Sequence, residues 1–297
     1  MNALRTALAG VHGVVRFHEP MRLHTSFRIG GPADAYIEPE DESALCRLMA
    51  QAHTAKVPVF VLGGTNLLVR DGGIRGIVVR LTRLDRIDGY DGGRLYVEGG
   101  VGMPRLLTYA LHHQLAGIEF VAGIPGTLAG SVVMNAGTRL GEMRDVVERV
   151  RLVTPTGAIR EVPADEVGFA YRQTRLPRGI VAGAWLRLRG DQTSGAGSVV
   201  KEALRRRKAT QPLALPTAGC VFKNPGGEPA GLLIEAAGLK GAQVGDAQVS
   251  TLHANFIVNR GRATARDVLS LIRKVGRTVE QRAGVTLQLE VRIVGQA

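Results

Sequence analysis

Hydrophobic and polar residues alternate along the chain with two different periods, and the period changes repeatedly from one segment to the next. Apolar residues spaced three and four apart predict helices, whereas short apolar runs that end at glycine or proline predict strands. The predicted helices cover residues 1–20 as a short lead-in, 41–53, 103–115, 127–135, 198–210, 230–237 and a long segment from about 265. The predicted strands cover residues 57–62, 77–81, 95–98, 180–188, 255–259 and 286–294, with two strands and a turn within 24–39 and a hairpin within 150–163.

Turn and capping residues mark where these elements begin and end. Thr264, with Asp267 three residues later, is a typical N-cap for the last helix. Pro212 and Pro216 exclude a regular helix through residues 211–216. Small and polar residues dominate at 190–198, so we place a domain boundary near residues 190–205, followed by an α+β domain.

Length and composition favour a cytoplasmic protein of more than one domain. The 297 residues suffice for two or three domains, and a hydrophobic content of 45% can fill their cores. No apolar run reaches the roughly 18 residues that span a bilayer, and the N-terminus lacks the apolar region and cleavage site of a secretory signal. Cys46 and Cys220 are too few and too far apart for a disulfide framework, which favours a reducing compartment.

The net charge of +12 has two interpretations, and residues 205–208 form its densest cluster. A predicted helix covers this cluster, so it can be an ordinary solvated face, or it can attract phosphorylated small molecules. No nucleic-acid motif and no stripe of stacking aromatics accompanies the charge. Nucleic-acid binding is therefore kept only as a rival function.

Two glycine clusters predict a diphosphate-binding site. The first, residues 62–66, follows a strand directly, and the second, residues 123–127, opens a helix. Glycines in such places adopt positive φ and let amide N–H groups face an anion, and two such loops in one domain favour a dinucleotide. The candidate cofactor-binding residues are Gly63, Gly64, Thr65, Asn66, Gly123, Ile124, Pro125, Gly126, Thr127, Gly130, Asn135 and Gly137.

The spacing of the glycines excludes the common nucleotide motifs. Neither cluster reads G-x-G-x-x-G, and no G-x-x-x-x-G-K-[ST] occurs, so a Rossmann site and a P-loop are not supported. The chain also lacks H-E-x-x-H and paired C-x-x-C, and its histidines are scattered, so no metal is predicted.

Three ionisable residues suggest chemistry at a carbon next to a carboxylate. Cys220 lies within residues 217–225, and Arg172 and Glu290 stand far from it in sequence. If a thiol, a guanidinium and a carboxylate are brought together, they suit protonation of such a carbon. A small buried cysteine, a surface arginine and a solvent-facing glutamate are the alternatives.

Seven segments in this order resemble one family: HTSFRIGGPA, LGGTNLLVRDGGIRG, GIEFVAGIPGTLAGSVVMNAG, FAYRQTRLP, TAGCVFKNP, LIEAAGLKG and HANFIVNRGRAT. The chain resembles the UDP-N-acetylenolpyruvoylglucosamine reductases from about residue 24 to residue 290. It is similar to the shorter subtype of the family, which lacks a tyrosine-bearing insertion.

The resemblance implies an α+β fold. In this family the first part of the chain has the FAD-binding fold of the PCMH/vanillyl-alcohol-oxidase type, with two subdomains that hold FAD. The C-terminal part is an α+β domain that binds the substrate. We accordingly assign residues 1–75 and 76–200 to the two FAD-binding subdomains and residues 201–297 to the substrate domain.

The resemblance also implies a reaction and the residues that perform it. NADPH reduces FAD and leaves, and the enolpyruvyl sugar nucleotide then accepts a hydride on its vinyl carbon. Arg172 matches the family arginine that stabilises the enolate, and Glu290 matches the glutamate beside the substrate carboxylate. Cys220 matches the proton donor, where a serine is commoner. Tyr171, Lys223 and Asn224 match substrate contacts, with Asn224 at the UDP diphosphate.

The thiol at position 220 has a consequence for pH dependence. A free thiol has a pKa of about 8.5, so it ionises readily, and activity should fall once it becomes a thiolate. The closest rival enzyme is another oxidase or dehydrogenase on the same FAD fold with covalent flavin. Residues 63–71 contain neither His nor Cys, which argues against a covalent flavin attached there. We predict small-molecule partners only, with no obligate protein partner.

Overall fold

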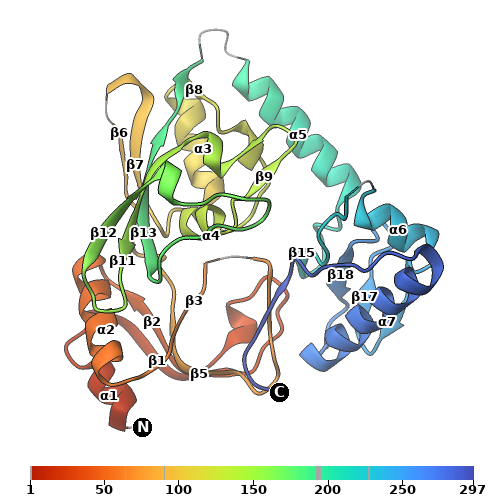
Figure 1. The fold of residues 1–297 in the computed structure, drawn as a ribbon, viewed down its shortest axis with the longest axis horizontal. Coiled ribbons are helices and arrows are strands. Elements are labelled where there is room, and N and C mark those ends of the chain that lie inside the picture. Colours follow the sequence, from red (N-terminus) through yellow and green to blue (C-terminus); the bar gives the residue numbers. More distant parts are fainter. Residues whose placement is uncertain (1, 64, 90, 192–194, 227) are drawn as a thin grey trace. The chain divides into compact units, whose positions relative to one another are not determined.

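The structure is a computed structural model that describes residues 2–63, 65–89, 91–191, 195–226 and 228–297. The chain forms two compact units, each assembled from separate segments (Figure 1). The first unit contains residues 1–17, 35–64 and 76–205, and the second contains residues 18–34, 65–75 and 206–297. The division into domains at residues 75/76 and 200/201 stays a prediction.

A five-stranded antiparallel sheet forms the centre of the first unit, in the order β12-β11-β13-β7-β6. Its middle strand, β13 (Ile180–Arg187), has nearly every side chain buried, as its continuous apolar sequence predicts. The short helix α4 (Leu128–Val133) packs against β13 and β7, which places it beside the sheet in Figure 1. The sheet therefore fixes the position of the second glycine cluster, which leads into α4.

A second sheet, in the order β1-β2-β5-β3, lies mostly in the same unit, and its strands β3 and β5 are parallel. The helix α2 (Glu42–Thr54) follows β2 and begins at Asp41, whose Oδ1 accepts the amide of Ala44 at 2.7 Å. Leu45 and Leu48 on its inner face are fully buried.

The second unit contains an antiparallel sheet in the order β15-β18-β17-β16 and two helices, α6 (Ala230–Ala236) and α7 (Ala265–Ala283). The apolar side of α7 is buried in the core of this unit, and Gly284 ends the helix with a left-handed φ of 68°. A parallel pair of strands, β4 and β19, completes the unit.

The strands have the following bounds. They are β1 Gly13–Pro20, β2 Pro32–Pro39, β3 Val59–Val61, β4 Leu67–Val69, β5 Ile74–Val79, β6 Ile87–Gly89, β7 Arg94–Glu98, β8 Leu115–Ala116, β9 Gly137–Thr138, β10 Gly141–Glu142, β11 Val147–Val153, β12 Ile159–Pro163, β13 Ile180–Arg187, β14 Arg189–Gly190, β15 Thr217–Cys220, β16 Gln243–Val244, β17 Ala247–Val249, β18 Phe256–Asn259 and β19 Arg292–Val294. The other α-helices are α1 Asn2–Leu8, α3 Met103–His112 and α5 Ala196–Thr210, and short 3-10 helices cover Met21–Leu23, Asp91–Gly93, Glu119–Val121, Met143–Asp145 and Ala164–Glu166.

Most predicted elements are confirmed within a few residues, including the hairpin of β11 and β12 and the capped start of α7. Three predictions are wrong in part. The helical lead-in ends at Leu8, and residues 13–20 form strand β1 instead. Residues 24–31 form no strand, because Arg28 and Gly30 have φ values of 54° and 139°, which interrupt extended pairing. The last strand is confined to β19, with only an isolated bridge at Leu289 before it.

Candidate active site

The predicted site residues fall into two groups, one in each unit. The first unit contains Gly63, the residues predicted between 123 and 137, and the pair Tyr171 and Arg172. The second contains Thr65, Asn66, Cys220, Lys223, Asn224 and Glu290. Gly64 lies outside the described residues.

In the first unit, the two glycine clusters touch each other. The amide and the hydroxyl of Thr127 both donate to the carbonyl of Gly63, at 3.3 and 3.1 Å. Thr127 is also the N-cap of α4, and its Oγ1 accepts the amide of Gly130 at 3.4 Å. A Cβ atom on Gly63 would lie 3.3 Å from that same Oγ1, so the contact needs a glycine or a small shift of Thr127.

The amides that can face an anion belong to the loops and not to the start of α4. The amides of Leu128 and Ala129 donate to the carbonyls of Val101 and Gly99, at 2.9 and 3.0 Å. Among the described residues, in contrast, no acceptor faces the amides of Gly63, Gly123 and Gly126. Gly123 and Gly126 have φ values of 72° and 105°, which glycine adopts without strain. These three donors fit the diphosphate of a dinucleotide, as expected for an FAD loop.

Arg172 lies at the tip of a tight turn in the same unit. Ala170 and Gln173 pair with each other, and Arg172 itself has a φ of 57°. Its Nη2 donates to the carbonyl of Gly137 at 2.9 Å, and its guanidinium carbon lies 5.1 Å from the ring centre of Tyr171. The arginine is half-buried.

In the second unit, Cys220 and Glu290 lie on adjoining backbone segments. The amide of Glu290 donates to the carbonyl of Val221 at 2.8 Å, and the amide of Lys223 donates to Gln288 at 2.8 Å. Both the Cys220 and the Glu290 side chains are partly exposed. The fold of this unit therefore brings a thiol and a carboxylate from distant parts of the sequence to one place.

The first glycine cluster continues into this second group. Asn66 donates from Nδ2 to the carbonyl of Glu290 at 3.3 Å and accepts the amide of Arg292 at 2.8 Å on its backbone oxygen. The carbonyl of Thr65 accepts the hydroxyl of Ser26 at 2.9 Å. Asn66 thus holds the segment that carries Glu290.

Asn224 helps to close the loop that follows Cys220. Its Oδ1 accepts the amide of Ala230, the first residue of α6, at 3.1 Å. The predicted contact of Asn224 with the UDP diphosphate stays a prediction.

Sequence reasoning missed Asn255, which holds the segment of Cys220 in place. Its Oδ1 accepts the amide of Phe222 at 2.9 Å, and its Nδ2 donates to the carbonyl of the same residue at 2.8 Å. Its backbone carbonyl accepts the amide of Val221 at 2.9 Å. Asn255 is 2% exposed, as expected for a polar side chain whose hydrogen bonds are satisfied inside the protein. The only signal for it in the sequence was a polar residue directly before an apolar strand.

Arg207 departs from the interpretation of residues 205–208 as a solvated face. Arg205, Arg206 and Lys208 are exposed as expected, whereas Arg207 is partly buried. Burial lowers the pKa of the Arg207 guanidinium, and the negative charge that Cys220 can carry acts in the opposite direction. Its buried Nε has no hydrogen-bond partner in the part of the chain that the structure describes. One cation of the basic cluster therefore lies near the candidate acid.

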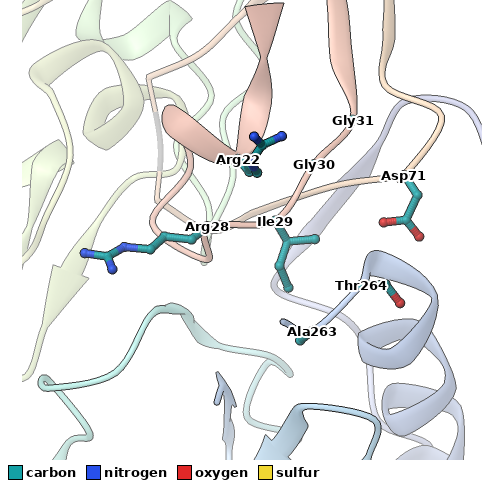
Figure 2. Close-up of a pocket in the computed structure, with 8 residues that line it drawn as sticks. All are labelled: Arg22, Arg28, Ile29, Gly30, Gly31, Asp71, Ala263 and Thr264. Atoms are coloured by element: carbon teal, nitrogen blue, oxygen red, sulfur yellow. The ribbon is translucent and has the colours of Figure 1, made fainter. Parts of the chain in front are cut away.

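A surface pocket of about 240 Å³ in the second unit contains none of the predicted site residues (Figure 2). The side chains of Arg22 and Arg28 point in different directions in Figure 2, and both are exposed. The carboxylate of Asp71 is engaged with α7, where it accepts the amides of Ala265 and Arg266 at 2.9 and 3.1 Å. The pocket therefore lacks the converging polar groups of an active site.

Two classes of feature are missing from the described residues. They contain no group of three or more His, Cys, Asp or Glu side chains able to hold a metal ion. None of the helices in the described ranges is long and apolar enough to cross a membrane.

Comparisons with known proteins decide the family. Residues 33–163 match the model of an FAD-binding domain, and residues 211–294 match the C-terminal domain of UDP-N-acetylenolpyruvoylglucosamine reductase. The chain is 48% identical to UDP-N-acetylenolpyruvoylglucosamine reductase 2 of Symbiobacterium thermophilum, over 95% of this chain and 93% of the relative. The chain belongs to the UDP-N-acetylenolpyruvoylglucosamine reductase family. A relative from Anaeromyxobacter sp. (strain K) is also 48% identical, over 93% of this chain and 84% of the relative.

A solved structure of the same family has the same fold. The UDP-N-acetylenolpyruvylglucosamine reductase from Thermus caldophilus superposes with a TM-score of 0.82 at 37% identity, covering 96% of this chain and 99% of that chain. The α+β fold with a PCMH-type FAD-binding part is thereby confirmed, and FAD is the cofactor. The glycine amides of the first unit fit that cofactor.

Proposed function

We propose that the protein is an FAD-dependent reductase that uses NADPH to reduce the enolpyruvyl group of UDP-N-acetylenolpyruvoylglucosamine, which yields UDP-N-acetylmuramate for peptidoglycan synthesis. The observation that carries this proposal is the adjoining placement of Cys220 and Glu290, joined through the backbone of Val221 in a chain of the reductase family. We further infer that the enzyme acts in the cytoplasm and serves cell shape and division.

The chain's own residues have three tasks in this reaction. The amides of Gly63, Gly123 and Gly126 hold the FAD diphosphate. When bound, FAD supplies the redox chemistry, in which hydride equivalents from NADPH pass to the terminal vinyl carbon of the substrate. Tyr171, Lys223 and Asn224 contact the sugar nucleotide.

Charge stabilisation and proton transfer fall to Arg172, Glu290 and Cys220. Hydride addition to the vinyl group places negative charge on the adjacent carbon and its carboxylate, and the permanently charged guanidinium of Arg172 can hold that carboxylate with two hydrogen bonds. The Sγ–H of Cys220 then donates its proton to the carbon that carries the charge. Glu290 lies beside the segment that contains Cys220, and it orients the end of the substrate that carries the carboxylate.

The test is an anaerobic experiment in two stages. The FAD-loaded protein is reduced with NADPH, excess NADPH is removed, and the enolpyruvyl sugar nucleotide is added while flavin absorbance is followed. We expect bleaching in the first stage and recovery of the oxidised spectrum in the second. A protein that is reduced but is not reoxidised by this substrate would refute the substrate assignment, and one that binds RNA but no flavin would favour the rival class.

A further inference from the structure

The turn that carries Arg172 requires support from outside itself. Ala170 and Gln173 exchange two backbone hydrogen bonds of 3.0 and 3.2 Å, with Tyr171 and Arg172 between them. Arg172 has a φ of 57° at the third position of this turn, where glycine or asparagine is usual. A long charged residue in that conformation persists only where its surroundings hold it.

The support comes from the last residue of α4 and from the segment that follows it. Asn135 donates from Nδ2 to the carbonyl of Ala170 at 3.2 Å, so that carbonyl accepts from both Asn135 and Gln173. The hydroxyl of Thr174 donates to the carbonyl of Val133 at 3.0 Å. The side chain of Arg172 itself reaches Gly137, as described above. Three hydrogen bonds therefore hold the turn: one at the carbonyl of Ala170, one from Thr174 directly after the turn, and one from the Arg172 side chain.

Asn135 is the buried member of this support. Its Oδ1 accepts the amide of Arg144 at 3.0 Å while its Nδ2 donates to Ala170, so both ends of the carboxamide bind backbone groups of the protein. The residue is 0% exposed, and its own φ of 42° is one that asparagine tolerates. A side chain in this position presents no surface to a cofactor.

We propose that Asn135 is a positioning residue that holds the Arg172 turn, and not a cofactor ligand as its sequence motif suggests. The inference rests on the proposed function, in which Arg172 grips the carboxylate of the substrate. The carboxamide of Asn135 holds the carbonyl of Ala170, which closes the turn. The conformation of the turn then determines which positions the guanidinium of Arg172 can reach. Loss of the Nδ2 donor lets the turn relax and moves the guanidinium away from the developing charge.

The decisive variant is Asn135→Asp, which keeps an acceptor for Arg144 and removes the donor to Ala170. We expect the rate of flavin reoxidation by the enolpyruvyl sugar nucleotide to fall roughly 10- to 100-fold, because displacements of about 1 Å at a charged group have effects of that size. The rate of flavin reduction by NADPH and the Kd of the apoprotein for FAD are expected to stay within about twofold of wild type. Thr174→Val removes the hydrogen bond from Thr174 to the carbonyl of Val133, and it should also lower the reoxidation rate. This variant replaces Asn135→Asp in the test if Asn135→Asp does not fold.

The matched control is Asn259→Asp in the second unit. Asn259 is 3% exposed and likewise donates from Nδ2 to a remote carbonyl, that of Phe27 at 3.1 Å, while its Oδ1 accepts the amide of Gly261. The control therefore removes the same kind of bond, and we expect it to lower the melting temperature while the reoxidation rate stays within about twofold.

A double-variant cycle shows whether Asn135 acts through Arg172. In an Arg172→Ala background, Asn135→Asp should change the reoxidation rate by less than about twofold, because the guanidinium that it positions is gone. Two results would overturn the proposal. One is a weakened affinity of Asn135→Asp for FAD. The other is a fall in the reoxidation rate on adding Asn135→Asp to Arg172→Ala that is as large as the fall in the wild-type background. Failure of the proposed function is distinguished separately, because the wild-type protein would then not be reoxidised by this substrate at all.

Discussion

Cys220 is the residue whose replacement tests the acid of the reaction most directly. In Cys220→Ala no proton donor remains at this position, so we expect the rate of substrate reduction to fall about 10²- to 10⁴-fold, the usual contribution of a general acid. Flavin reduction by NADPH should be unchanged, and Cys220→Ser should retain measurable activity because a hydroxyl can also donate. Stopped-flow measurement of the two half-reactions checks both expectations.

Cys46 supplies the control for that experiment. It is the other cysteine, it lies on α2 in the first unit, and burial together with the nearby Glu42 raises the pKa of its thiol. Cys46→Ser should leave both half-reactions within about twofold of wild type. Equal losses in the Cys46 and Cys220 variants would point to a general effect on folding and would contradict the assignment of Cys220.

His253 makes the stability of the protein depend on pH in a definite direction. Burial lowers the pKa of its imidazole, nearby Lys240 lowers it further and Glu235 acts against both, while Nδ1 accepts the amide of Asn255 at 3.2 Å. An unfolded histidine, with a pKa of about 6.5, therefore takes up a proton at a higher pH than the folded one does. Stability should be fully present above pH 6.5 and decline as the pH falls below it.

The variant His253→Asn isolates this effect. Its side-chain oxygen can accept the same amide but cannot be protonated near neutral pH, so the fall in melting temperature between pH 7.5 and 5.5 should be smaller than in wild type. Exposed His112 on α3, changed to Asn, provides the comparison. Identical pH profiles for wild type and His253→Asn would contradict the argument.

Single residues also show where sequence reasoning reaches its limit. The family resemblance predicted Cys220 and Glu290 as site residues, and the fold of the second unit brings them to adjoining segments. It did not predict that the Asn135 side chain is fully buried, or that Arg207 is partly buried and close enough to Cys220 for their charges to interact. The direction of one side chain depends on neighbours that are remote in sequence, and a local pattern does not contain them.

Among the elements, α7 begins at a helix end that is capped twice. Thr264 and Asp267 form a capping box, and the carboxylate of Asp71 accepts two further amides of the first turn. We expect Asp71→Ala to destabilise the second unit by about 1–2 kcal/mol, because it removes two hydrogen bonds and a favourable charge at the helix N-terminus. Urea unfolding measures the change.

Two further variants define that prediction. Asp71→Asn keeps one hydrogen-bond acceptor and loses the charge, so it should lower the free energy of unfolding by less than Asp71→Ala does. Asp88, which forms an exposed ion pair with Arg86, is the surface control, and Asp88→Ala should change stability by less than about 0.5 kcal/mol. If Asp71→Ala were as harmless as Asp88→Ala, the second cap would have no energetic role.

The two caps differ in how far the sequence reveals them. The capping box spans four residues, and it was predictable from the spacing of Thr264 and Asp267. Asp71 lies 194 residues before Ala265, so only the folded chain relates them. The same reason explains the error at residues 24–31, where apolar alternation suggested a strand but the backbone turns at Arg28 and Gly30.

At the scale of the whole molecule, the chain order does not correspond to its compact units. The second unit draws residues 18–34 and 65–75 from the N-terminal part of the chain. Parallel pairing of β4 with β19 joins residues that are more than 200 positions apart, and hydrophobic periodicity cannot predict such a pair. The family and its FAD-binding fold were predictable because seven ordered motifs carry much more information than any single element.

The last prediction concerns Arg172 and Cys220, which belong to different units of the chain. If both act on one substrate molecule, their effects on substrate reduction must be coupled, because each group is useful only when the other is in place. The variant Arg172→Ala should lower the reoxidation rate about 10²-fold or more. The double variant with Cys220→Ala should then be much less impaired than the product of the two single losses. The combination of Cys46→Ser with Arg172→Ala is the control, and its effect should equal that of Arg172→Ala alone. A rate for the Arg172→Ala/Cys220→Ala protein equal to the full product would mean that the two residues act independently, and the joint mechanism would fail while the family assignment stands.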